Sequence, residues 1–163
     1  MAEPAHRIVD EPLAGKAAKP TPVILLVDDD EMTRISMAGR LKRLGYRVIE
    51  ADDGVAGLAA IRAQRPDLVI LDWMMPGLDG PSVCEAIRAD GELRSSQVVL
   101  MTAHDQPEQI AEGLSRGADD FLSKAASKQE VLARVQASLR SNALVREIER
   151  TRDDLDRSHR LLS

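Results

Sequence analysis

The sequence has very little cysteine and no long apolar run. Cys84 is its only cysteine, so no internal disulfide can form, and a reducing, cytoplasmic location is expected. The longest apolar run near the start, Val23–Val27, is far shorter than the ~20 residues of a membrane-spanning helix, so no membrane partner is expected. The first 20 residues contain no long apolar segment, which argues against a secretory signal.

The chain also lacks an excess of positive charge. It carries 22 Lys and Arg against 27 Asp and Glu, a net charge of -5. Proteins that bind nucleic acid on their own usually show a basic patch, so no direct nucleic-acid partner is expected. With 163 residues, 44% hydrophobic and 30% charged, the chain fits one globular domain with extensions.

Strand and helix patterns alternate along most of the chain. Residues 1–21 show no periodicity and are interpreted as a flexible arm. Short apolar runs predict strands at 23–27, 46–51, 67–72, 97–101 and 120–123. Helical periodicity predicts helices at 30–44, 53–64, 81–89, 107–116 and from 127 to near the end. This alternation indicates an α/β fold with a parallel sheet covered by helices on both faces.

Polar side chains follow the apolar runs at the predicted carboxyl ends of four strands. They are Asp28 and Asp29 on the first strand, Asp72 on the third, Thr102 on the fourth and Lys124 on the fifth. Ligands of such sheets bind outside the carboxyl ends of the strands, so these side chains are expected to face one crevice.

Each of these residues has a simpler explanation when it is taken alone. One or more of the three adjacent aspartates at 28–30 could cap the following helix, and Asp72 could be a turn residue. Thr102 could be a capping or loop residue, and Lys124 a solvated surface lysine. The conjunction of these types at four separate strand ends favours a shared site.

The combination suggests phosphoryl chemistry. Clustered carboxylates with a loop carbonyl form an oxygen site of the kind that Mg²⁺ uses. A carboxylate can itself be the nucleophile and form an aspartyl phosphate. Positive charge and hydrogen-bond donors around the phosphoryl oxygens would come from Mg²⁺, Lys124 and Thr102.

Four stretches resemble the receiver domain of bacterial two-component response regulators, and the resemblance covers about residues 22–140. They are residues 24–29 (ILLVDD), 67–80 (DLVILDWMMPGLDG), 99–103 (VLMTA) and 117–124 (GADDFLSK). The resemblance implies a flavodoxin-like, doubly wound sheet of five parallel strands in the order 2-1-3-4-5. It also implies a sensor histidine kinase or phosphotransfer protein as phosphoryl donor, and a signalling protein rather than an enzyme.

The resemblance also implies roles for individual residues. Asp72 would be the phosphoacceptor. Asp29, Asp72 and the Met74 backbone carbonyl would bind Mg²⁺ directly, and Asp28 would act largely through a metal-bound water. Thr102 would hydrogen-bond the acyl phosphate and move toward it on activation, and Lys124 would pair with a phosphate oxygen.

Three further positions match variable or switching positions of the family. Phe121 matches the aromatic switch residue, although a Phe in a short strand is more often a core residue and this ring has no hydroxyl. Met74 and His104 match the two positions that tune phosphate lifetime, although His104 could be a plain loop residue.

One departure from the family pattern follows the active-site lysine. The family usually has a proline there with a cis peptide bond, whereas this chain has Ala125. Because a cis bond without proline costs ~2.5–4 kcal/mol, the Lys124–Ala125 bond is expected to be trans. This puts the reach of Lys124 in doubt and predicts slower or weaker phosphorylation than in a proline variant.

The last predicted helix continues beyond the receiver-like region, as a helical extension over residues 141–163. Leu132, Val135 and Leu139 are expected to pack on the sheet. Further residues recur at spacings of four and three, which is typical of a coiled-coil dimer linker: Leu144, Ile148, Thr151, Leu155, Ser158 and Leu162. The alternative is a single solvated helix. A homodimer is expected through this extension and the face formed by the fourth helix, fifth strand and fifth helix.

Two other functions compete with the phosphorylation switch. A Mg²⁺-dependent phosphohydrolase of the haloacid dehalogenase type also uses an aspartyl phosphate, but its nucleophile lies on the first strand. Asp28 and Asp30 supply part of that family's Asp-x-Asp-x-(Thr/Val) pattern, whereas Met32 breaks it. The other alternative is an unphosphorylated pseudo-receiver scaffold, which Ala125 favours and the complete set of acids opposes.

Overall fold

Parallel strands alternate with helices along the chain. The computed structural model describes residues 20–103 and 106–162. The strands are β1 Val23–Val27, β2 Arg47–Ala51, β3 Leu68–Asp72, β4 Val98–Thr102 and β5 Asp120–Ser123. The helices are α1 Glu31–Arg43, α2 Gly54–Gln64, α3 Gly80–Ala89, α4 Pro107–Ser115 and α5 Lys128–Leu161. The strands pair in the order β2-β1-β3-β4-β5, which confirms the predicted flavodoxin-like topology.

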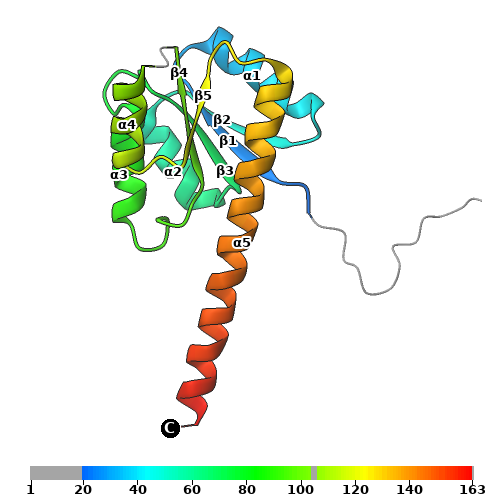
Figure 1. The fold of residues 1–163 in the computed structure, drawn as a ribbon, viewed down its shortest axis with the longest axis vertical. Helices are drawn as coiled ribbons and strands as arrows, with labels where there is room; N and C mark the ends of the chain where they lie inside the picture. The colour runs from blue at the N-terminus through cyan, green and yellow to red at the C-terminus, as the bar shows by residue number, and fades with distance from the viewer. Residues whose placement is uncertain (1–19, 104–105, 163) are drawn as a thin grey trace, which may run out of the picture.

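The sheet separates two apolar layers (Figure 1). Helices α1 and α5 cover one face, where Met37, Leu41 and Val131 pack against alternate residues of the strands. Helices α2, α3 and α4 lie on the other face, where Ile61 and Val83 pack against the residues in between. The central strands β3 and β4 are buried along their whole length, as parallel strands covered on both faces must be.

Short polar side chains begin four of the helices. Asp30, Asp53, Asp79 and Ser127 each accept a hydrogen bond from the backbone N–H three residues later. Each cap satisfies one of the N–H groups that the first helical turn leaves without a partner. Among the three adjacent aspartates, Asp30 therefore has the capping role, and Asp28 and Asp29 remain for the site.

The helices bury narrower stripes than their apolar patterns suggest, and the buried face of α5 agrees with the sequence prediction only in part. In α1 the apolar side chains of Met32 and Ile35 are exposed. In α5 Val135 is buried and Leu139 packs against the core as predicted, whereas Leu132 is not part of that core cluster. The other buried positions of the helix are Val131, Ser138 and Asn142. The reason is rotational: only one stripe of each helix can face the sheet, and the α5 stripe includes two polar residues that the apolar pattern missed.

Helix α5 is a single helix that continues well past the sheet (Figure 1). Its last side-chain contact with the rest of the fold, among those the structure shows, is Arg146, which pairs with Asp67 at 2.7 Å. Residues 147–162 are all exposed. None of the described helices is long and apolar enough to cross a membrane.

Candidate functional site

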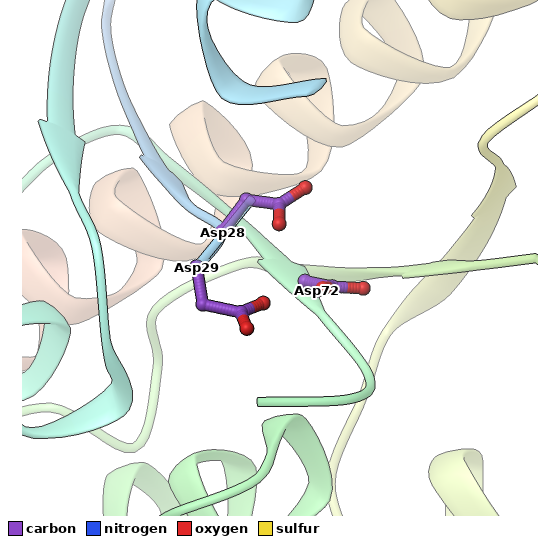
Figure 2. A group of neighbouring side chains, drawn as sticks. All are labelled: Asp28, Asp29 and Asp72. Atoms are coloured by element: carbon purple, nitrogen blue, oxygen red, sulfur yellow. The ribbon is translucent and has the colours of Figure 1, made fainter. Parts of the chain in front are cut away.

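Three carboxylates meet where β1 and β3 end (Figure 2). Asp28 and Asp29 directly follow β1, and Asp72 is the last residue of β3. Because β1 and β3 are parallel neighbours, their carboxyl ends lie at the same edge of the sheet. One oxygen from each of the three carboxylates lies within 4.8 Å of the others. Asp28 and Asp72 are buried, with Asp72 only 3% exposed, whereas Asp29 is open to solvent.

Backbone contacts hold Asp28 in place. Its Oδ1 accepts a hydrogen bond from the backbone N–H of Asp30 at 2.9 Å, and its carbonyl oxygen accepts one from Arg34 at 2.8 Å. Its Oδ2 is buried without a hydrogen-bond partner, 3.7 Å from the Lys124 ammonium. A buried carboxylate oxygen without a hydrogen-bond donor is costly, so this oxygen is available to a ligand.

Lys124 completes the charged group. Its Nζ lies 2.9 Å from Oδ1 of Asp72, and its side chain is 26% exposed. The Lys124–Ala125 bond is trans as expected, because no described peptide bond is cis. The backbone N–H of Ala125 donates to the Ser123 hydroxyl at 3.2 Å, and that of Lys124 donates to the Thr102 carbonyl at 3.0 Å. The doubt about the reach of Lys124 is therefore removed: the lysine contacts Asp72 without the proline.

The pKa values of Asp72 and Lys124 reflect this crowding. Burial raises the pKa of Asp72, and the charge of Asp28 adds to this, so that despite the Lys124 hydrogen bond it reaches about 6. Burial by itself would lower the pKa of Lys124, but its hydrogen bond to Asp72 and the charges of Asp72, Asp28 and Asp29 raise it. Lys124 thus stays charged, while Asp72 is poised to bind a proton or another cation.

The raised pKa of Asp72 predicts a pH-dependent stability when no metal is added. The folded state holds the Asp72 proton up to about pH 6, whereas the unfolded chain releases it near 3.8, so the free energy of unfolding falls as pH rises between these values. A shift of this size corresponds to roughly 1–3 kcal/mol. Asp72→Asn should therefore raise the free energy of unfolding at about pH 7 by roughly that amount. Urea unfolding in EDTA tests this, and equal stability of both proteins would contradict it.

Thr102 and Phe121 lie on β4 and β5, the two strands that follow β3 in the sheet. Thr102 is the last residue of β4 and is buried, and its hydroxyl donates to the side-chain oxygen of Gln109 on α4 at 3.4 Å. The Phe121 ring is partly buried against the core, with its centroid 6.2 Å from that of Trp73. A methyl group on Gly113 of α4 would lie only 2.5 Å from the Phe121 ring. Helix α4 therefore touches both Thr102 and Phe121, and Gly113 permits the close approach.

The loop after β3 connects Asp72 to α3. Met74 lies in it with an exposed side chain, and Gly77 has a positive φ of 80° that favours glycine. At Gly80, an added Cβ would collide with the Asp72 carbonyl and the Trp73 backbone, so only glycine fits there. His104 lies outside the described residues.

Two residues near the site were missed by the sequence reasoning. Gln109 contacts the Thr102 hydroxyl, and Arg34 holds the Asp28 carbonyl while pairing with Glu50 at 3.4 Å. Neither contact has a local sequence signal, because each joins a helix residue to a residue at the end of the preceding strand, and only the turn of the backbone between them brings the two together.

The residues present fit a divalent cation. Carboxylate oxygens are the ligands that Mg²⁺ prefers, and three of them converge here. Oδ2 of Asp28 accepts no hydrogen bond, and the pKa of Asp72 is raised by burial and, to a smaller extent, by the charge of Asp28. A cation bound between them would relieve the repulsion.

Comparisons of the sequence with known proteins all indicate the same family. The model of the response regulator receiver domain matches residues 24–136. Response regulator MprA of Mycobacterium ulcerans is 43% identical over 121 residues, which are 74% of this chain and 51% of that protein. Transcriptional regulatory protein AfsQ1 of Streptomyces coelicolor is 40% identical over 119 residues, 73% of this chain and 52% of that protein. The chain thus spans about half the length of these relatives.

Solved structures of response regulator and chemotaxis proteins have a similar fold. The receiver domain of Francisella response regulator 1452 is 32% identical with a TM-score of 0.68, covering 74% of this chain and 98% of that one. Vibrio cholerae chemotaxis protein CheY4 is 29% identical with a TM-score of 0.69, covering 72% of this chain and 98% of that one.

Receiver domains act in phosphorelay signalling rather than as enzymes, interact with histidine kinases or phosphotransfer proteins, and generally bind Mg²⁺ at an acidic pocket. By the family model, the sequence identities and the fold, this chain belongs to the response regulator receiver domains.

Proposed function

We propose that this receiver accepts a phosphoryl group on Asp72 in the presence of Mg²⁺ and switches conformation in response. The observation that carries the proposal is the setting of Asp72. It is a nearly fully buried carboxylate that contacts an ammonium at 2.9 Å and has two further acids beside it. A carboxylate that served only the fold would not need an ammonium group and two other carboxylates beside it.

The roles of the site residues follow from their positions. Asp29, Asp72 and the Met74 carbonyl would hold Mg²⁺ directly, and Asp28 would hold it through a bound water. When bound, Mg²⁺ would supply positive charge to the phosphoryl oxygens. Lys124 would pair with a phosphoryl oxygen, for which its ammonium at the mouth of the site is well placed.

The transfer itself needs only one nucleophile. An Asp72 carboxylate oxygen attacks the phosphorus of a phosphohistidine on the donor kinase or phosphotransfer protein. The phosphorus–nitrogen bond breaks, its electron pair stays on the imidazole nitrogen, and that nitrogen takes up a proton. The product is an aspartyl phosphate at residue 72.

The switch would run through helix α4. When Thr102 turns toward the phosphoryl group, its hydroxyl leaves Gln109, and the space behind it opens for the Phe121 ring. Because Gly113 packs directly on that ring, a ring movement displaces α4. We further propose that Met74 and His104 tune the lifetime of the phosphate.

We assign residues 22–140 to the receiver, residues 1–21 to an arm and residues 141–163 to an extension. The face formed by α4, β5 and α5 would change its affinity for a second copy, and the extension would join the same dimer. This stretch of chain would not bind nucleic acid directly, in line with its net charge of -5.

Incubation with a small phosphodonor such as acetyl phosphate, with and without Mg²⁺, tests the proposal. A phosphoacceptor switch takes up about one phosphoryl group per chain and only when Mg²⁺ is present. Continuous turnover of phosphate monoesters would indicate a phosphohydrolase instead. No labelling under any condition would indicate a scaffold.

The residue after Lys124 gives a prediction about rate. Ala125→Pro gives the loop the residue usual in the family: it fixes φ after Lys124 and removes the N–H that donates to the Ser123 hydroxyl, so the loop that carries Lys124 is redirected. We expect the initial rate of labelling by acetyl phosphate to rise in this variant. An unchanged rate together with an unchanged loop path would show that Ala125 does not limit phosphorylation.

A further inference from the structure

The end of α5 carries apolar side chains that the described part of the chain does not cover. Leu144, Ile148 and Leu155 are 59%, 61% and 57% exposed, and residues 147–162 are exposed throughout. An isolated helix of this length is marginal in water, because helices in proteins are stabilised mainly by packing an apolar face. A continuous helix here therefore calls for a partner surface (Figure 1).

The uncovered side chains form one stripe, which we name the tail seam. It consists of Leu144, Ile148, Thr151, Leu155, Ser158 and Leu162. Its spacings of four and three place the members at alternating d and a positions of a heptad repeat. A shallow groove lies along it, lined by Leu144, Ile148, Thr151 and Leu155, and offers a recess for a side chain of a facing helix.

The side chains beside the tail seam form two columns, one of acidic and one of basic residue types. Position g, on one flank, holds Glu147 and Asp154, and position e, on the other flank, holds Arg152 and His159. In a parallel two-stranded coiled coil, each g residue faces the e residue five positions later on the other helix. Glu147 then faces Arg152 of the second copy, and Asp154 faces its His159. In an antiparallel pair, acids would face acids.

We infer that the tail seam is covered by a second copy of this chain, as a parallel coiled coil in register. This deepens the dimerisation part of the proposed function and rests on it. The pairing of acidic with basic residues points to a second copy of this chain and to parallel helices. Two copies with these columns place acidic residues opposite basic ones only when the helices run in the same direction.

The tail seam also continues onto the receiver. At ~100° per residue it lies roughly 160° around α5 from the buried stripe of Val131 and Val135. It is on the side where Arg134 pairs with Asp120 of β5. The next seam positions toward the receiver are the small residues Ser141, which is exposed, and Ala137, which is partly buried. Small residues there let two α5 helices approach beside the proposed α4-β5-α5 face.

Thr151 and Ser158 make the tail seam weak. These two polar residues occupy core positions of a coiled coil that is only about three heptads long, so the extension alone binds its copy weakly. Contacts between the two receivers raise the effective concentration of one tail for the other. The dimer is therefore one that the state of the receiver can shift.

Cysteine cross-linking tests the direction of the helices. Ile148→Cys and Leu155→Cys should each give a disulfide-linked dimer on mild oxidation, because equivalent core positions face each other in a parallel pair. Asp153→Cys, at the outer f position, is the matched control and should stay monomeric. The native Cys84 does not interfere, because it is buried and burial raises its pKa to about 12. An antiparallel pair could link at most one of the two core positions, which would overturn the inference.

Charge exchange tests the pairing. Glu147→Arg and Arg152→Glu should each weaken self-association in sedimentation by roughly tenfold, because two pairs per dimer become repulsive. The double variant should restore it. Glu149→Arg, which makes the same charge change at an outer position, should have little effect. Strengthened association in the single variants would indicate antiparallel helices, and no dimer at any concentration would refute the inference.

These measurements are made on the unphosphorylated protein and repeated in Asp72→Asn. Labelling of Asp72 with no core-position cross-link would reject the coiled coil alone. Cross-links with no labelling would reject the phosphorylation proposal and leave the coiled coil standing.

Discussion

Replacing Asp72 with asparagine is expected to abolish labelling by a small phosphodonor. The amide keeps the shape of the side chain at the end of β3 but has no nucleophilic carboxylate oxygen. The fold should survive, because the change removes a desolvated charge whose pKa is raised to about 6. Labelling followed by intact-protein mass spectrometry, alongside an unfolding curve, separates loss of the acceptor from loss of the fold.

Asp30→Asn is the matched control for this experiment. Asp30 is an acid of the same cluster in sequence, but it accepts hydrogen bonds from the Thr33 backbone N–H at 3.0 Å and from its hydroxyl, and so caps α1. Asparagine caps helices about as well as aspartate. The variant should therefore label normally. Labelling that persists in Asp72→Asn but disappears in a variant at Asp28 would favour the phosphohydrolase arrangement.

Replacing Lys124 with methionine is expected to slow labelling by about 10²-fold, the usual cost of removing one donor from a developing anion. The variant should also need a higher pH. Burial raises the pKa of Asp72 and the Lys124 hydrogen bond and charge lower it, so removing the lysine raises that pKa further. A larger fraction of Asp72 is then protonated near neutral pH and cannot attack phosphorus. The pH profile of the initial labelling rate measures both effects.

Lys128→Met provides the comparison for the lysine. Lys128 is exposed in the first turn of α5, four residues from Lys124, and loses the same charge without facing the acids. Its labelling rate and pH profile should match the wild type. A Lys124→Met protein that labels at the wild-type rate would show that the contact with Asp72 has no part in the transfer.

Much of the site could be predicted because the end of a buried strand is marked in the sequence by the end of an apolar run. Apolar runs stop at Asp28, Asp72, Thr102 and Lys124, and parallel strands bring their carboxyl ends to one edge of the sheet. The structure brings the acids and Lys124 together as expected. It places Thr102 at the same edge on the neighbouring strand, with Gln109 as a partner that no local pattern signals.

Other features depend on how the backbone turns and how each helix is rotated about its axis, which a sequence pattern does not specify. Asp28, Asp29 and Asp30 are the same residue type in a row, and only the turn of the backbone into α1 decides that Asp30 is the cap. In α5, Ser138 and Asn142 occupy the buried stripe although they are polar. The helix rotates to place Val131 and Val135 against the sheet, and the residues one and two turns later must follow.

The central claim is tested most directly by locating the label. The protein is incubated with acetyl phosphate and Mg²⁺, the acyl phosphate is reduced with borohydride, and the modified residue is identified by peptide sequencing in a mass spectrometer. The account predicts reduction at residue 72 alone, and none when EDTA replaces Mg²⁺. Reduction at Asp28 with Asp72 unmodified, or no reduction at any residue, would contradict it.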